Sequence, residues 1–221
     1  MSRTILHRSI FLALAVAMPA AALALAPQQA PTVSQAPRAA ASTIPAEAAG
    51  SYSVDSVHSN AHFKVQHLGA GRFWGRFDEV KGAIQYTPGA AGTLEFDIQI
   101  PIAGVHTGND SLDRHLASPD FFNEKEFPEM KFKSSSAAPA ATGLWKVEGE
   151  LTLLGVTKPV TAMVEFTGAA DKGRGMRIGF EAMFSIKRSE FGMGYGVENG
   201  ALGDDVFVVV GLEATANKEG T

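Results

Sequence analysis

The most constraining feature of this chain is a strict alternation of apolar and polar side chains over residues 94–102. Successive side chains of a β-strand point to opposite faces, so a period of two places every apolar side chain of this run on one face. The run therefore predicts a β-strand that is buried on one side. Its apolar positions are Leu94, Phe96, Ile98, Ile100 and Ile102.

Similar runs recur along the chain, separated by Gly, Pro and Asp clusters that are typical of turns. We expect about eight antiparallel strands, and this regular spacing favours a closed barrel or a sandwich. Val206–Leu212 is apolar throughout, which indicates a strand buried on both faces. The expected strands cover residues 52–56, 60–68, 72–86, 93–104, 129–136, 144–154, 159–167, 176–188 and 205–215, with 72–86 broken into two near Asp78.

Residues 109–123 break the β pattern and predict a helical lid or plug inserted between two strands. Asn109 or Asp110 would cap a short helix whose last turn contains His115. The segment Ser118-Pro119-Asp120 would start a second, very short helix. The fold class is therefore all-β with a short helical insertion.

The first 50 residues differ in composition from the rest of the chain. Arg3 and Arg8 precede an apolar run that ends in small residues near Ala26, which predicts a secretory signal peptide over 1–26. The alternative is an uncleaved anchor, but Pro19 interrupts a run shorter than the roughly 20 strongly apolar residues that a spanning helix needs. Residues 27–50 are rich in Ala and Pro and predict a disordered tether. The folded domain is expected over 51–216, followed by a tail over 217–221, in the periplasm or secreted.

Charge and cysteine content exclude several classes of protein. The chain has 19 Lys and Arg against 23 Asp and Glu, a formal net charge of −4. Loss of residues 1–26 would remove two of these positive groups and no acid, which leaves −6. Such a balance argues against nucleic-acid binding, which needs clustered cations. The absence of Cys from the sequence excludes disulfides, thiol chemistry and a Cys-based zinc site.

Histidine spacing gives little support for a metal site. His58 and His62 are four residues apart, a spacing that suits one metal on a helix. In a strand the same spacing separates the two positions by about 13 Å, so we expect structural histidines and no metal. Asp204 and Asp205, with Glu198, lack the spacing of a calcium loop and are read as a solvated turn.

Catalytic and phosphate-binding motifs are equally weak. Of Ser111, Asp113 and His115, only the first and last would share a helix face, so we read helix capping and expect no catalytic residue. Gly192–Gly196 is Gly-rich, but strand patterns flank it, and we expect a flexible loop at a cavity rim. Lys187, Arg188 and Glu190 are interpreted as a charged strand end that could contact a polar head group.

Several longer strings of the sequence form a recognisable set. They begin with His58-Ser59 and His67-Leu68-Gly69, continue with Asp113–Ser118, Asp120-Phe121-Phe122, Phe127-Pro128 and Gly149–Val160, and end with Phe184–Met193 and Gly203–Val206. Together these strings resemble the YceI-like family of bacterial, usually periplasmic, polyisoprenoid-binding proteins. The resemblance covers roughly residues 51–216, and the string from Leu151 to Val160 is its most specific part.

The resemblance implies an extended, lipocalin-like antiparallel barrel that holds an amphipathic or isoprenoid lipid in an apolar pore, with no catalytic residue and no obligatory cofactor or metal. Inward apolar side chains would contact that ligand, although each could equally be plain core. Ala162 stands where a bulkier strand residue is expected, and either widens the cavity or faces outward. The candidate contacts are Phe63, Val65, Phe73, Phe77, Leu94, Phe96, Ile98, Ile100, Leu116, Phe121, Phe122, Phe132, Leu151, Leu153, Phe180 and Phe184.

The expected function is thus an exported protein that binds a polyisoprenoid or similar lipid, such as a quinone tail, for transport, storage or sequestration. One alternative is an enzyme acting on a lipid or quinone through His67, His115 or the charged rim. Another is a ligand-free structural or stress-response barrel. The expected partner is a lipid and not a nucleic acid, while transient membrane contact and a homodimer through Val206–Leu212 as an edge strand stay open.

Overall fold

The computed structural model describes residues 43–89 and 93–217, which form eleven strands, one α-helix and three short 3₁₀ helices. No helix within these two ranges is long and apolar enough to cross a membrane. The strands are β1 (Gly50–Val54), β2 (Asn60–His67), β3 (Gly71–Phe77), β4 (Lys81–Thr87), β5 (Thr93–Pro101), β6 (Val105–His106), β7 (Glu129–Ala141), β8 (Leu144–Leu153), β9 (Val156–Asp171), β10 (Met176–Lys187) and β11 (Leu202–Ala216). The helices are η1 (Ala46–Ala48), η2 (Ile102–Gly104), α1 (Asp110–Ala117) and η3 (Arg188–Phe191).

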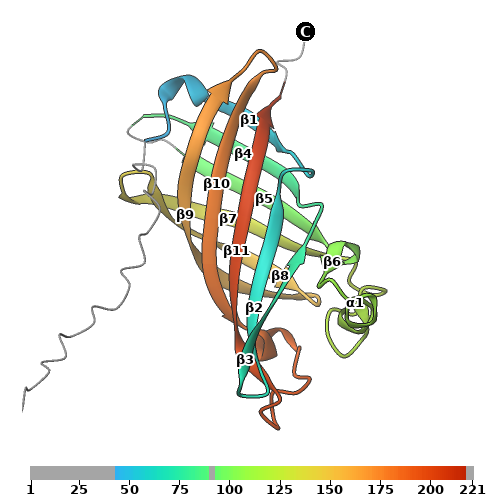
Figure 1. Ribbon diagram of the computed structural model, residues 1–221. Coiled ribbons are helices and arrows are strands. Elements are labelled where there is room, and N and C mark those ends of the chain that lie inside the picture. The colour runs from blue at the N-terminus through green and yellow to red at the C-terminus, as the bar shows by residue number, and fades with distance from the viewer. Residues whose placement is uncertain (1–42, 90–92, 218–221) are drawn as a thin grey trace, which may run out of the picture. The chain divides into compact units, whose positions relative to one another are not determined.

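Eight of the strands close into an antiparallel barrel (Figure 1). Their order is β1-β4-β5-β7-β8-β9-β10-β11, and the ring closes where Tyr52 of β1 lies opposite Ala216 of β11. The predicted barrel is confirmed, including the break near Asp78 that separates β3 from β4. The alternative of a sandwich is set aside because one continuous ladder joins all eight strands.

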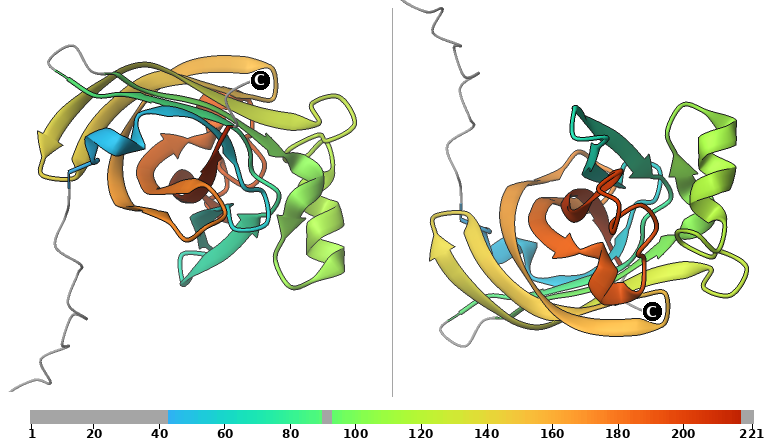
Figure 2. Two further views of the ribbon diagram at one scale, coloured as in Figure 1. Left: turned by 90° about the horizontal axis from the view of Figure 1, so that it is seen from above. Right: turned by 90° about the horizontal axis from the view of Figure 1, so that it is seen from below.

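Strand β11 pairs with two different strands, β1 and β2, along the edge that faces away from β10, so the sheet branches at β11. Its last residues pair with β1, whereas Val206–Gly211 pair with β2 between Val65 and Asn60. The hairpin of β2 and β3, extended by β6, therefore branches away from the closed ring (Figures 1 and 2). The expectation that Val206–Leu212 forms an edge strand is wrong, because β10 also pairs with it along its other side.

The helical insertion is present, but it contains one α-helix and not two helices. Asn109 caps α1, and its side chain accepts hydrogen bonds from the backbone N–H groups of Ser111 and Leu112. The segment 118–123 forms turns, because the N–H groups of Phe121 and Asn123 both donate to the Ser118 carbonyl. The predicted second helix is therefore wrong.

The folded domain begins before Ser51. Ile44 and Ala48 are buried in the core, and the hydroxyls of Tyr86 and Tyr52 donate to their carbonyl oxygens at 3.2 and 2.8 Å. Residues 43–50 thus belong to the barrel and not to the predicted tether. The predicted signal peptide and the remainder of the tether lie outside the described residues, as does the tail beyond Asn217.

Two strands extend further than their sequence pattern predicts. Strand β7 continues past residue 136 to Ala141, and β9 runs from Val156 to Asp171 in place of 159–167. The extra part of β7 consists of Ala and Pro, and register shifts occur between Ser134 and Ser136 and between Pro139 and Ala141. These bulges remove the regular alternation on which the prediction relied.

Candidate functional site: an apolar barrel cavity

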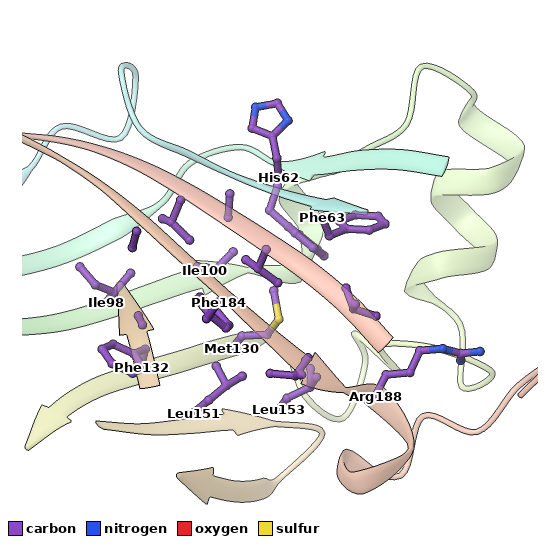
Figure 3. Close-up of a pocket in the computed structure, with 18 of the residues that line it drawn as sticks. His62, Phe63, Ile98, Ile100, Met130, Phe132, Leu151, Leu153, Phe184 and Arg188 are labelled. Carbon is purple, nitrogen blue, oxygen red and sulfur yellow. The ribbon is translucent and has the colours of Figure 1, made fainter. Parts of the chain in front are cut away.

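The barrel encloses an apolar cavity of about 150 Å³ (Figure 3). Directly paired residues of an antiparallel ladder lie on the same face of the sheet. The partners of a residue that lines the cavity therefore face the cavity as well. Ile98 of β5 pairs with Phe132 of β7, which in turn pairs with Leu151 of β8. All three side chains line the cavity.

Most of the predicted contact residues lie in this wall. Whether they touch a ligand remains a prediction, because the structure gives only their position. Those that line the cavity are Phe63, Val65, Phe77, Phe96, Ile98, Ile100, Leu116, Phe121, Phe122, Phe132, Leu151, Leu153 and Phe184.

Phe73, Leu94 and Phe180 are not part of the lining. The ring of Phe180 packs between Phe96 and Phe166, with centroids 5.3 and 5.7 Å away, and closes the core beyond the cavity. Leu94 is fully buried in the same core. Phe73 is half-buried on β3, opposite Val65. For these three residues the structure favours packing over ligand contact.

Sequence reasoning missed about half of the wall, mostly in the last three strands. Ala162 is 3% exposed and lines the cavity, which settles that it faces inward. The alternation in β10 and the apolar run in β11 indicate that these residues are buried, but neither pattern indicates which face of the strand lines the cavity. The additional apolar residues are Ala61, Met130, Val147, Val164, Ala182, Ile186, Met193, Leu202, Val206, Val208, Val210 and Leu212.

Three lining residues are polar, and the polar end of each is engaged or directed elsewhere. Lys131 forms an ion pair with Glu129 at 2.8 Å. The imidazole of His62 and the guanidinium of Arg188 lie away from the other labelled side chains in Figure 3. The wall therefore offers hydrocarbon to an occupant and little hydrogen bonding.

Three rings from two segments meet next to this wall, and we call them the rim cluster: His115, Phe121 and Tyr195. Centroid distances are 5.0 Å for His115–Phe121, 5.4 Å for His115–Tyr195 and 5.1 Å for Phe121–Tyr195. His115 Nε2 also lies 3.1 Å from Asp120 Oδ2. The cluster joins the helical insertion to the Gly-rich loop, so both segments cover the same end of the cavity.

The Gly-rich loop is held by a buried cation. The guanidinium of Arg188, a residue only 3% exposed, donates to the carbonyl oxygens of Gly203, Met193 and Tyr195 at 2.8, 3.1 and 2.7 Å. Burial lowers the pKa of Arg188, because desolvation disfavours its charged form. The expectation of an exposed charged strand end is therefore wrong at Arg188, which serves as an internal bracket for the loop.

The neighbouring acids are engaged in the same region. The carboxylate of Asp204 accepts from the hydroxyl and the N–H group of Ser189, at 2.8 and 2.9 Å. Asp205 pairs with Lys187 at 2.9 Å across the ladder of β10 and β11. These contacts favour a structural role for both acids over cation binding.

One cluster in the described chain has the composition of a metal site: Asp55, His58 and Glu213, whose ligand atoms lie within 4.8 Å of one another. The guanidinium of Arg177 bonds to both carboxylates, so a positive charge already occupies the position between them. His58 and Arg177 donate hydrogen bonds to Asp55 and lower the pKa of this carboxyl to about 2. The arrangement is an ion-pair network that ties β10 and β11 to the turn after β1.

The three residues considered as a hydrolytic set are engaged separately. Asp113 accepts from the hydroxyl and N–H group of Thr107 at 2.6 and 2.8 Å, whereas His115 contacts Asp120. Ser111 donates its N–H to the Asn109 cap. His67 is exposed at the end of β2. These contacts favour capping and loop anchoring as the roles of Ser111, Asp113 and His115.

Comparisons with known proteins agree with the barrel. The model of the YceI-like domain matches residues 52–214. UPF0312 protein plu2095 of Photorhabdus laumondii is 31% identical over 173 residues, covering 77% of this chain and 88% of that protein. The crystal structure of Burkholderia cenocepacia BcnA has a TM-score of 0.64 at 26% identity, over 73% of this chain and 99% of BcnA. A polyisoprenoid binding domain from Saccharophagus degradans has a TM-score of 0.59 over 75% of this chain and 98% of that domain; at 20% identity this likeness concerns the fold alone.

Proposed function

The chain belongs to the YceI-like family, and from this premise we propose that it is an exported protein that holds a polyisoprenoid or similar amphipathic lipid, such as a quinone with a prenyl tail, in its barrel. The role would be transport, storage or sequestration of that lipid. The predicted leader over residues 1–26 would deliver the protein to the periplasm or the exterior. No chemical step is part of this proposal.

The observation that carries the proposal is the chemical uniformity of the cavity wall. Apolar side chains from β2, β5 and β7–β11 surround the space. Two lining residues carry a charge, and both charges are engaged: Lys131 pairs with Glu129, and Arg188 donates to backbone carbonyls. A prenyl chain is almost wholly hydrocarbon, so its burial here would contribute roughly 25 cal/mol per Å² before ordering costs. A domain of the same fold from Saccharophagus degradans is described as a polyisoprenoid binding domain, so this ligand class is the first to test.

The size of the cavity adds a constraint on how such a ligand would bind. A space of about 150 Å³ holds one small ring, whereas pockets for larger ligands measure roughly 300–1,000 Å³. A long prenyl chain must therefore displace part of the wall. Met130 and Met193 are suited to this, because their unbranched side chains change rotamer readily. The head group would remain near the rim cluster.

A fluorescence titration tests the proposal. Trp145 packs against the core and pairs opposite Val164, a lining residue, so it should report an occupied cavity. In a Trp74→Phe variant, Trp145 is the single tryptophan. Addition of a prenyl alcohol should change its emission saturably, and a straight-chain alcohol of equal hydrophobicity should compete.

The matched control is the Trp145→Phe variant, in which Trp74 reports the outer surface. Its emission should not follow occupancy of the cavity when the ligand is added below its own solubility limit. A titration that fails to saturate, or one in which both tryptophans respond alike, would show that the alcohol associates non-specifically and would contradict the proposal.

A further inference from the structure

The outer face of the hairpin formed by β2 and β3 carries aromatic and basic side chains together. Lys64 pairs with Trp74, Gln66 with Arg72 and His62 with Arg76 across the ladder, and paired residues share a face. Phe63 and Val65, at the alternate positions of β2, line the cavity, so this set points outward. Phe207 and Val209 of β11 continue it, because they pair with Lys64 and His62. We call Lys64, Arg72, Trp74, Arg76, Phe207 and Val209 the outer patch.

The patch differs in charge from the protein that carries it. The chain has a formal net charge of −4, yet the outward positions of β2 and β3 hold Lys64, Arg72 and Arg76 and no acid. The flanking acids pair at the border, Asp78 with Arg76 and Asp205 with Lys187, both at 2.9 Å. An anionic surface would therefore attract this face and repel the acidic remainder of the protein. The protein would then approach the surface with the outer patch towards it.

Exposed apolar groups accompany these cations. Trp74 is 49% exposed, and Leu68 at the tip of the same hairpin is 65% exposed. The Lys64 ammonium lies 5.0 Å from the Trp74 ring centroid and 4.6 Å from that of Phe207. Amphipathic rings beside cations are the combination found at the head-group level of membranes, where the ring is partly buried and the cation meets phosphate.

The position of the patch links it to the cavity. Two of its three strands, β2 and β11, supply Phe63, Val65 and Val208 to the cavity wall on their opposite face. The tip of the hairpin also meets the Gly-rich region, because the N–H group of Leu68 donates to the Ala201 carbonyl at 2.8 Å. A bilayer that contacts the patch would thus lie next to the end of the barrel that α1 and the Gly-rich loop cover.

We propose that the outer patch docks this protein onto the surface of an anionic lipid bilayer, with Trp74 at the head-group level and Lys64, Arg72 and Arg76 on lipid phosphates. Docking is peripheral and reversible. It is independent of whether the cavity holds a lipid, so either property can fail without the other.

Vesicle flotation tests the docking. The full chain should float with vesicles of mixed phosphatidylglycerol and phosphatidylcholine, and not with phosphatidylcholine alone. The triple variant K64Q/R72Q/R76Q should bind about 100-fold more weakly, since each basic residue near such a surface contributes about 1 kcal/mol. The matched control K125Q/K172Q/R174Q makes the same change in net charge at exposed cations outside the patch, and it should bind like the unchanged protein.

A spectroscopic measurement locates the contact. In the Trp145→Phe variant, emission from Trp74 should shift to the blue on anionic vesicles, and added salt should reverse the shift because surface electrostatics are screened. Equal losses of vesicle affinity in the two triple variants would overturn the proposal, and so would equal flotation on anionic and neutral vesicles. A third contradictory result would be a concentration-dependent dimer that K64Q/R72Q/R76Q abolishes, with no vesicle binding by the unchanged protein. That result would assign the patch to a second copy of the chain.

Discussion

The rings of Phe77 and Phe122 meet edge to face, with centroids 5.0 Å apart and planes at 87°. Phe77 ends β3, whereas Phe122 belongs to the turn after α1, and both rings line the cavity. Among the described strands, the hairpin of β2 and β3 pairs with the barrel ring through β11, and the contact of these two rings attaches it in addition to the Leu68–Ala201 hydrogen bond. The helical insertion therefore closes the side of the cavity that the hydrogen-bonded ladder leaves open.

Truncation of Phe122 tests this closure. Phe122→Ala should lower the free energy of unfolding by about 3–5 kcal/mol, the usual cost of removing a buried Phe ring. It should also enlarge the cavity, so a prenyl ligand should restore part of the lost stability. Urea unfolding with and without ligand measures both effects. Phe122→Leu keeps most of the apolar volume and should lose clearly less; equal losses in the two variants would indicate that the ring does not close the cavity.

Ala162 offers a way to fill the cavity without disturbing the surface. Ala162→Leu should weaken ligand binding at least tenfold, because the added side chain occupies ligand volume, and overpacking should cost about 1–3 kcal/mol of stability. Thr161→Leu, one residue earlier and on the exposed face of β9, is the matched control and should bind normally. Calorimetric titration with a prenyl alcohol gives the comparison. Unchanged affinity in Ala162→Leu would place the ligand elsewhere.

Arg188 should control the order of the Gly-rich loop. Arg188→Met removes three charge-assisted hydrogen bonds to backbone carbonyls and should cost about 3 kcal/mol of stability. Amide hydrogen exchange in residues 192–203 should accelerate more than in β8 or β9. Arg188→Lys keeps the charge but not the planar fork of donors, so it should rescue the loop only in part. Uniform acceleration across the barrel would argue against a local bracket.

Acid stability should depend on Asp55. Its pKa falls to about 2 when folded because His58, and next Arg177, donate hydrogen bonds to the carboxylate, whereas an unfolded Asp titrates near about 3.9. A depressed folded pKa stabilises the protein above the unfolded value, and this contribution disappears as the pH falls from about 4 to about 2.

We expect the contribution to be about 1–2 kcal/mol, since Asp55 is still 18% exposed. The difference in free energy of unfolding between the natural protein and Asp55→Asn should thus be constant above about pH 4.5 and shrink towards pH 2. Parallel stability curves for the two proteins throughout that range would contradict this assignment.

The period of two in the sequence was sufficient to predict antiparallel strands and the break near Asp78, but it left a barrel and a sandwich both open, and the resemblance to the YceI-like family favoured the barrel. Strand ends were less accessible. The Ser/Ala-rich end of β7 carries no alternation, and its pairing depends on the partner strand β8. Ile44 and Ala48 looked like part of a tether because their burial depends on two tyrosines, Tyr86 and Tyr52, that lie later in the chain.

The cavity wall was predictable in kind but not in extent. Phe180 and Phe184 share one parity of β10, yet only Phe184 lines the cavity, while Phe180 packs on Phe96 and Phe166. Periodicity specifies a face of a strand and not a height along the barrel. Arg188 also looked like a surface charge, because two of the three carbonyls that it contacts, those of Met193 and Tyr195, come from a loop without a regular pattern.

The most direct test of the central claim is mass spectrometry of the organic extract of protein purified without added lipid. The proposal predicts an isoprenoid or other prenyl-tailed amphiphile in a fixed ratio to protein, present in the Thr161→Leu control and strongly reduced in Ala162→Leu. An extract free of such lipids, or one with the same lipids in equal amounts from both variants, would contradict a lipid-holding cavity.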